Sequence, residues 1–195
     1  MAGARTLTER ELKLTLAQCQ TRQHSTRDKT IVLFSVLAGL RACELAALKI
    51  ADVYDTSGRP RSSTVLAVDQ TKGHSTRRVY INTELQRALK EYWPLVADRS
   101  SNAALFATRY GAAFSANTMS QLFLDLYHSC GLRGCSSHSG RKTFITRLAD
   151  KGVAVHLLAA LAGHKHISTT QRYITVNEAL LSRAVSWYDA SVCAC

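Results

Sequence analysis

The sequence has no apolar run long enough to cross a membrane. Its longest one, residues 31–40, is about half of the ~20 residues that a transmembrane helix needs. The first nine residues, Met-Ala-Gly-Ala-Arg-Thr-Leu-Thr-Glu, contain neither an apolar core nor a small-residue cleavage site, so no secretory signal is visible. There is no low-complexity tract either, which excludes a long disordered tail. We therefore expect a folded cytoplasmic protein.

The residues that usually handle phosphates with the help of a metal or a nucleotide are also missing. Acidic side chains are scattered singly, at Glu44, Asp52, Asp55, Asp69 and Asp125 for example, with no D-x-D or other paired carboxylates that would hold Mg²⁺. No G-x-x-x-x-G-K-[ST] loop is present. If the chain acts on phosphates, we expect it to do so without a metal ion and without ATP.

The six cysteines fit neither a disulfide framework nor a zinc site. They are Cys19, Cys43, the pair Cys130 and Cys135, and the pair Cys193 and Cys195, and these spacings match no set of paired zinc ligands. Without an export signal, reduced thiols are the default. We expect no metal site and no bound cofactor.

What the sequence does have is positive charge. Lys and Arg number 25 against 14 Asp and Glu, which gives a net charge of +11. Such a chain attracts polyanions, among which nucleic acid is the commonest partner, although charge alone identifies none.

The hydrophobic pattern predicts one α-rich domain over residues 1–195, with a small three-stranded antiparallel sheet. The strands are expected at 50–54, 64–69 and 76–81, where β-branched residues alternate, and Lys72 falls in the second turn. Helices are expected before and after these strands along the chain. Their ranges are 8–20, 29–38, a short one from Arg41, 83–92, 115–131, 138–151, 153–162, a short one from Ser168, and 177–187.

Several side chains suited to a phosphodiester pocket follow one another along this pattern. His138 and Arg141 lie three residues apart in the first turn of a predicted helix, where exposed amides favour an anion. His164 follows a glycine at a predicted helix end, and Tyr173 comes nine residues later. Arg41 begins a helix. Each of these residues alone is most simply a surface residue; only their joint order carries weight. The other histidines and tyrosines are expected to be packing or surface residues.

The joint order of these residues resembles the signature of the tyrosine recombinase (phage integrase) family. Residues 38–45 (Ala-Gly-Leu-Arg-Ala-Cys-Glu-Leu) are similar to its first arginine box. Residues 138–144 (His-Ser-Gly-Arg-Lys-Thr-Phe) and 161–164 (Leu-Ala-Gly-His) are similar to its second box, and residues 169–174 (Thr-Thr-Gln-Arg-Tyr-Ile) to its nucleophile box. The resemblance covers residues 7–188.

The resemblance implies a site-specific recombinase of a phage or mobile element, in which a tyrosine attacks a DNA phosphate and forms a 3′-phosphotyrosyl link. Duplex DNA would be the partner, so the protein would be associated with the nucleoid. The residues that the resemblance implies are catalytic are Tyr173, Arg41, Arg141, His138, His164 and Lys72, with Glu44 in support. Lys49 and Lys90 are alternatives to Lys72 if the predicted strands are shifted.

Two further expectations concern organisation. Family members usually carry a separate N-terminal DNA-gripping domain, and since the first predicted helix begins at Thr8, we expect this domain to be absent from residues 1–195. Two explanations stay open: the chain is the catalytic domain of a longer protein, or it is a naturally short recombinase. Residues 177–195 carry an apolar stripe, which packs on its own domain or docks on a neighbouring protomer within a tetramer on DNA.

Three other functions stay open at this point. A type IB topoisomerase-like nicking and closing activity shares the chemistry, and a non-catalytic DNA-binding module could keep the same fold. A metal-dependent nuclease fits the sequence least well.

Overall fold

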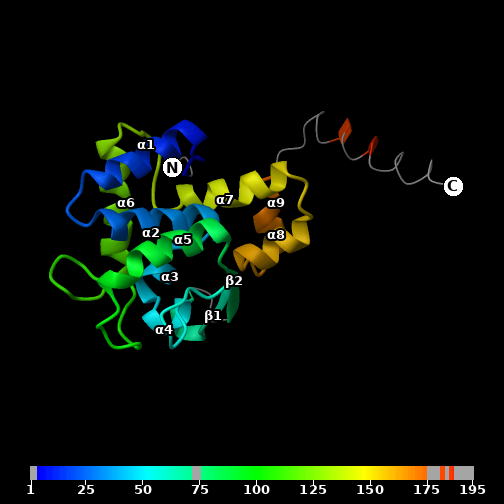
Figure 1. Cartoon of the computed structure of the whole chain (residues 1–195). Coiled ribbons are helices and arrows are strands. Elements are labelled where there is room, and N and C mark those ends of the chain that lie inside the picture. The colour runs from blue at the N-terminus through cyan, green and yellow to red at the C-terminus, as the bar shows by residue number, and fades with distance from the viewer. Residues whose placement is uncertain (1–3, 72–75, 175–180, 183–184, 187–195) are drawn as a thin grey trace. The chain divides into compact units, whose positions relative to one another are not determined.

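The computed structural model describes residues 4–71, 76–174, 181–182 and 185–186 (Figure 1). The chain divides into two compact units, residues 1–144 and residues 145–195, and each is described by itself.

The first unit is mainly helical. Its helices begin where the sequence supplies caps: the Thr8 hydroxyl accepts a hydrogen bond from the amide of Glu11, and Ser115 caps a later helix in the same way. The helices are α1 (Glu9–Gln20), α2 (Ser25–Leu37), α3 (Ala42–Ala47), α4 (Ile50–Val53), α5 (Thr83–Tyr92), α6 (Ala116–Ser129) and the start of α7 (Ser139–Asp150), with two short 3₁₀ helices, η1 (Val68–Gln70) and η2 (Trp93–Leu95).

Helix α2 forms the centre of this unit. It carries the longest apolar run of the chain, and residues 30–36 are all buried. Helices α1 and α5 lie alongside it (Figure 1). The Phe34 ring meets that of Phe106 edge to face, with centroids 6.1 Å apart. The most apolar segment of the sequence is thus the one that other elements cover from several sides.

The sheet has two strands in the described part of the chain, not the three that the sequence predicted. Strand β1 (Ser63–Leu66) pairs antiparallel with β2 (Arg77–Tyr80), so that Ser63 faces Tyr80 and Leu66 faces Arg77. The strand expected at 50–54 is wrong: this segment forms α4, and Tyr54 makes an isolated bridge with Pro60. The Asp52 side chain accepts a hydrogen bond from the backbone amide of Lys49 and so caps a helical turn. This turn buries Ile50 and Val53 together.

Other boundaries also differ from the prediction. Asn82 caps α5 by accepting from the amide of Leu85, so the cap lies one residue before the expected Thr83. Helix α2 begins four residues earlier than predicted, and α7 begins at Ser139, one residue after His138.

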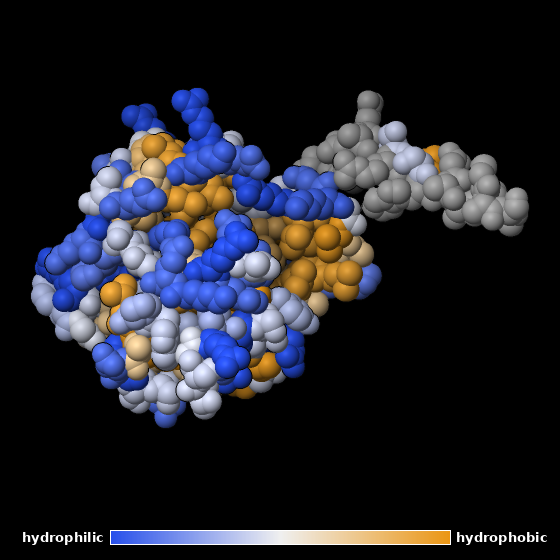
Figure 2. Space-filling model, viewed as in Figure 1, coloured by the Kyte–Doolittle hydropathy of each residue, from blue (hydrophilic) through white to orange (hydrophobic). Residues whose placement is uncertain are grey.

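The second unit contains the rest of α7, α8 (Val155–Ala162) and α9 (Ile167–Gln171). Helix α8 ends as predicted at Gly163, which adopts the left-handed conformation (φ 62°) that glycine tolerates best. Apolar side chains gather on the exposed side of α8 (Figure 2), where Leu157 is about half exposed. The helix predicted at 177–187 lies mostly outside the described residues; within it, Leu181 and Val185 are exposed.

The predicted fold class, mainly α-helical with a small antiparallel sheet, is confirmed. Among the described residues, no helix combines the length and apolar character that a membrane span requires.

Candidate active site

A pocket of about 370 Å³ in the first unit is lined by two of the sequence-predicted residues, Arg41 and His138. It lies where α3, η1 and α6 meet the chain just before α7. The other lining residues are small or polar: Ala42, Cys43, Asp69, Gln70, Thr71, Ala116, Ser120 and Ser137. A pocket lined by a guanidinium, an imidazole and several hydroxyls suits an anionic, oxygen-rich group.

Arg41 is held by a carboxylate three residues further along the chain. Glu44 Oε1 accepts from Arg41 Nη1 at 2.7 Å, and Glu44 Oε2 accepts from the backbone amide of Arg41 at 2.8 Å. The Glu44 side chain is fully buried, whereas that of Arg41 is 21% exposed. The carboxylate therefore fixes both the start of α3 and the direction of a guanidinium that reaches the pocket.

A second arginine binds the same carboxylate from the sheet. Arg77 Nη1 donates to Glu44 Oε2 at 2.8 Å, and Arg77 Nη2 donates to the carbonyl of Ala38 at 3.2 Å. Burial works to raise the pKa of Glu44, but the charges of Arg77, Arg41 and Arg141 together with the Arg41 amide outweigh it, and the pKa is lowered. Glu44 is therefore a carboxylate at neutral pH.

Arg141 converges on the turn that precedes Arg41. Its Nη1 donates to the carbonyl of Gly39 at 2.7 Å, and the residue is 4% exposed. Gly39 has φ +65°, and a Cβ at this position would lie 2.5 Å from the Phe144 ring. The turn therefore needs glycine for its conformation and for the close approach of α7.

His138 stands immediately before α7 and is exposed, with its amide donating to Ser136 Oγ at 3.3 Å. Gly140, in the first turn of α7, packs against α2. A Cβ on Gly140 would lie 2.3 Å from Ser35 Oγ. The absence of a side chain at residue 140 is what lets the segment that carries His138 and Arg141 lie so close to α2.

In the second unit, His164 and Tyr173 lie together. Their rings are stacked, with centroids 5.9 Å apart and an interplanar angle of 21°. His164 Nδ1 lies 2.8 Å from Oγ1 of Thr170, which is buried in α9, and the Tyr173 amide donates to the Thr170 carbonyl at 2.9 Å. Thr170 thus connects the imidazole to the backbone that bears the phenol.

Lys72 lies outside the described residues, although Thr71, which precedes it, lines the pocket. The two alternatives are described. Lys49 caps α4 and Lys90 is exposed on the last turn of α5, and neither lines this pocket.

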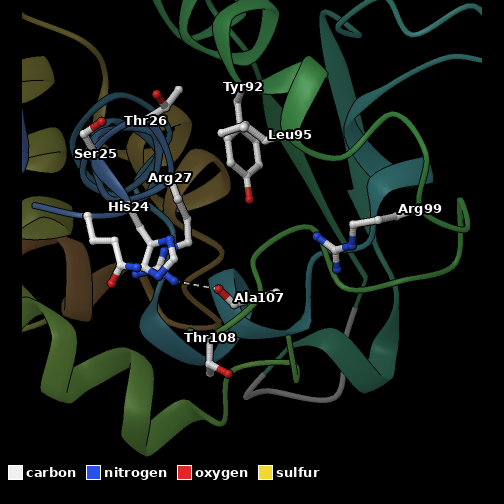
Figure 3. A pocket seen from close by; sticks show the side chains of 10 residues that line it. His24, Ser25, Thr26, Arg27, Tyr92, Leu95, Arg99, Ala107 and Thr108 are labelled. Atoms are coloured by element: carbon white, nitrogen blue, oxygen red, sulfur yellow. Dashed lines mark hydrogen bonds between the residues drawn. The ribbon is translucent and has the colours of Figure 1, made fainter. Parts of the chain in front are cut away.

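A second pocket of the first unit, about 400 Å³ in volume, contains none of the predicted residues (Figure 3). His24, Arg27, Tyr92 and Arg99 line it. Arg27 Nη1 donates to the carbonyl of Ala107 at 2.8 Å, and its guanidinium also pairs with Asp28. Arg99 Nη2 likewise donates to the carbonyl of Ala104. Because this pocket brings together none of the sequence-predicted residues, it is the weaker candidate for the active site. Over the described ranges, no three His, Cys, Asp or Glu side chains gather where they could hold a metal ion.

Sequence reasoning missed Arg77. The signal was available: in the alternating segment 76–81, Arg77 shares a face with Val79 and Ile81, which are both buried. A charged residue on the core face of a strand needs a buried partner, and here that partner is Glu44.

The sequence model of the phage integrase family matches residues 5–179. The chain belongs to this family.

Curated relatives are tyrosine recombinases. XerC of Pelobacter propionicus is 27% identical over 84% of this chain and 51% of its own length; XerA of Pyrococcus furiosus is 29% identical over 93% and 60%. The chain thus spans about half to three fifths of the length of these relatives.

Solved structures agree. A crystal structure of XerA recombinase superposes with a TM-score of 0.75 at 26% identity, over 96% of this chain and 66% of that one. XerH recombinase bound to its palindromic difH substrate after cleavage gives 0.70 at 22% identity, over 94% and 52%. The chain therefore has the fold of tyrosine recombinases.

Proposed function

We propose that this chain is the catalytic part of a site-specific tyrosine recombinase that cleaves and rejoins duplex DNA without a metal ion or ATP. The observation that carries this proposal is the pairing of Arg41 with the buried Glu44 at a pocket that His138 also lines. A guanidinium fixed in direction before any ligand arrives is what stabilisation of a phosphoryl transition state needs.

Tyr173 is the proposed nucleophile. Its phenol oxygen forms a bond to the scissile phosphorus while the bond from that phosphorus to the 5′-oxygen breaks. The phenol loses its proton, with His138 accepting it or orienting the phosphate, and Lys72 protonates the departing 5′-oxygen. A 5′-hydroxyl of a second DNA strand then attacks the phosphotyrosine, restoring a phosphodiester and releasing the tyrosine. No phosphoester bond is lost overall, so no ATP is consumed.

The arginines bind the phosphate in this proposal. Arg41 and Arg141 clamp the two non-bridging oxygens, and His164 donates a hydrogen bond to a phosphoryl oxygen. Loss of one such contact typically slows catalysis by ~10²–10³-fold. Support comes from the chemistry of the side chains and from the XerC and XerA relatives, which are tyrosine recombinases.

Duplex DNA is the proposed partner. The net charge of +11 favours a polyanion, and XerH, which shares the fold, was solved on its DNA substrate. We further propose that the protein associates with the nucleoid and assembles as a tetramer on DNA, with residues 177–195 docking on a neighbouring protomer. Leu181 and Val185, exposed in the described part of this segment, support such docking.

Covalent capture of DNA tests the function. The protein is expressed in cells, recovered under denaturing conditions with EDTA present, and the attached DNA is sequenced, comparing the wild type with Tyr173→Phe. We expect EDTA-resistant adducts that disappear in Tyr173→Phe, with attached sequences clustering at one site. Adducts that persist in Tyr173→Phe would reject this nucleophile. DNA binding without any adduct would favour a non-catalytic binding module.

The captured site then separates recombination from nicking and closing. A supercoiled plasmid carrying two copies of the site should yield recombinant products. Relaxation of that plasmid without exchange between the copies would instead identify a topoisomerase-like activity.

A further inference from the structure

Glu44 is a buried carboxylate that binds two arginines, and its two oxygens accept hydrogen bonds from different groups. Oε1 accepts from Arg41 Nη1, whereas Oε2 accepts from the Arg41 amide and from Arg77 Nη1. Since two donors hold Oε2 from different directions, the carboxylate cannot rotate freely. Its other oxygen is consequently aimed at the Arg41 guanidinium.

Arg77 is not among the residues that line the pocket, and it is more deeply buried than Arg41. Its side chain is 4% exposed, against 21% for Arg41. Burying an arginine is unfavourable unless its partners are well placed, because the charge leaves water. Here the Glu44 carboxylate and the carbonyl of Ala38, at the end of α2, both accept hydrogen bonds from Arg77.

The Ala38 contact ties Arg77 to the turn that carries Arg41. Helix α2 ends at this turn, and its last carbonyls attract cations. Arg77 therefore joins three parts of the site: strand β2, the end of α2 and the acid at the start of α3. A lysine could not make this connection equally well, since its single ammonium lacks the planar fork that reaches two acceptors in fixed directions.

We propose that Arg77 is a positioning residue: it holds Glu44 so that Glu44 directs the Arg41 guanidinium toward the DNA phosphate. The catalytic consequence rests on the proposed function, whereas the orientation of Arg41 does not. Arg77 itself does not touch the phosphate.

Nitrogen NMR of the arginine side chains, recorded on residues 1–195 without DNA, tests the orientation of Arg41. A guanidinium held by a carboxylate rotates slowly about its Nε–Cζ bond and gives separate signals for its two Nη groups. We expect separate Arg41 signals in the wild type and merged ones in Arg77→Met. Arg78→Met is the matched control, because Arg78 is the exposed neighbour on the same strand and the change in net charge is identical. Separate Arg41 signals in a folded Arg77→Met protein would overturn the proposal.

Covalent DNA capture tests the consequence. Misplacement of a catalytic group by a distant substitution can cost about 100-fold in rate, so we expect adduct formation to fall by that order in Arg77→Met and to stay within about twofold of the wild type in Arg78→Met. Arg77→Lys should be intermediate. A wild-type rate in Arg77→Met would overturn the catalytic part of the proposal.

A double variant separates positioning from folding, because Arg77→Met alone leaves a buried acid with one partner fewer. Arg77→Met combined with Glu44→Gln removes both charges, which should restore thermal stability. Positioning through Glu44 predicts that the double variant cleaves as slowly as Glu44→Gln alone, because Arg77 acts only through that carboxylate. Recovery of cleavage together with stability would show a merely structural role and overturn the proposal.

The pH profile gives a further readout. Arg77 is the largest single contributor that lowers the pKa of Glu44, and Arg41 and Arg141 are the other cations facing it. Without Arg77 this pKa rises, so cleavage by Arg77→Met should decline at acidic pH where the wild type does not. An unchanged decline of cleavage at acidic pH in Arg77→Met would count against the proposal.

Failure of the proposed function can be told apart from failure of this proposal. If the wild type forms no Tyr173-dependent adduct, the proposed function fails, and the arginine NMR spectra still decide whether Arg77 orients Arg41.

Discussion

The imidazole of His164 is stacked on the ring of Tyr173, and the same imidazole is hydrogen-bonded through Nδ1 to Thr170. This contact with a buried hydroxyl fixes the orientation of the imidazole ring. The short segment from the end of α8 to the end of α9 thus carries an imidazole of fixed ring orientation next to a phenol.

Thr170→Val should slow DNA cleavage, although Thr170 is not one of the proposed phosphate-binding residues. The substitution keeps the shape of the side chain but removes the hydroxyl that orients His164. For histidines that bind metals, loss of such a supporting hydrogen bond costs about 10- to 100-fold, and we expect a decrease of that order here. Covalent capture measures the effect. Ser168→Ala, which removes an exposed hydroxyl from the same helix, is the control. Equal capture by both variants would show that the Thr170 bond is dispensable.

Gly140→Ala should destabilise the protein by about 1–3 kcal/mol, because the new methyl group would overlap Ser35 on α2. Ordinary helix propensity predicts the opposite sign, a gain of about 0.5–1 kcal/mol. Urea unfolding of the two proteins distinguishes these outcomes. An increase in the free energy of unfolding would mean that α7 and α2 can move apart at no cost.

The Arg5–Glu11 ion pair should make stability depend on acid pH. The hydrogen bond from Arg5 and the amide of Thr8 lower the pKa of Glu11 from 4.5 to about 2. A carboxyl whose pKa is lower in the folded state contributes stability that is complete above the unfolded pKa and is lost as pH falls toward the folded one. Unfolding free energies measured between pH 6 and pH 2 (roughly the window set by these values) should therefore fall more steeply in the wild type than in Glu11→Gln. Glu9→Gln, an exposed acid of the same helical turn, should follow the wild type.

DNA affinity should depend strongly on salt. With a net charge of +11, and with about eight phosphates contacted, the logarithm of the binding constant should fall with the logarithm of salt concentration at a slope of roughly −7. Fluorescence anisotropy with a random-sequence duplex between low and moderate salt gives this slope. A slope close to zero would mean that the positive charge of the chain does not face DNA phosphates.

The part of the site that sequence spacing could predict lies at a single helix start. Arg41 precedes α3 and Glu44 is the third residue of that helix, so the capping geometry brings them together, and the structure has them in contact at 2.7 Å. The stacking of His164 on Tyr173 could not be predicted in this way, because the eight intervening positions include the short helix α9, whose geometry the spacing does not determine.

The errors in the predicted fold have local causes. Ile50 and Val53 are β-branched and favour a strand by composition, but Asp52 caps the amide of Lys49 and both apolar side chains are buried from one helical turn. Three or four residues carry too little periodicity to distinguish the two structures. Arg77 was overlooked for a different reason: its partner is 33 residues away along the chain, and only the folded sheet brings the two side chains together.

The convergence of Arg77 and Arg141 on consecutive carbonyls, those of Ala38 and Gly39, has a consequence for ligand affinity. Immobilising a long side chain on binding typically costs about 0.5–1.5 kcal/mol. These two arginines, together with Arg41 on Glu44, lose that freedom when the chain folds. An anion that enters the pocket therefore meets an Arg41 guanidinium whose direction is already fixed. The loss of side-chain entropy thus lowers the free energy of unfolding of the free protein and not its affinity for the anion, so the pocket binds as a rigid receptor.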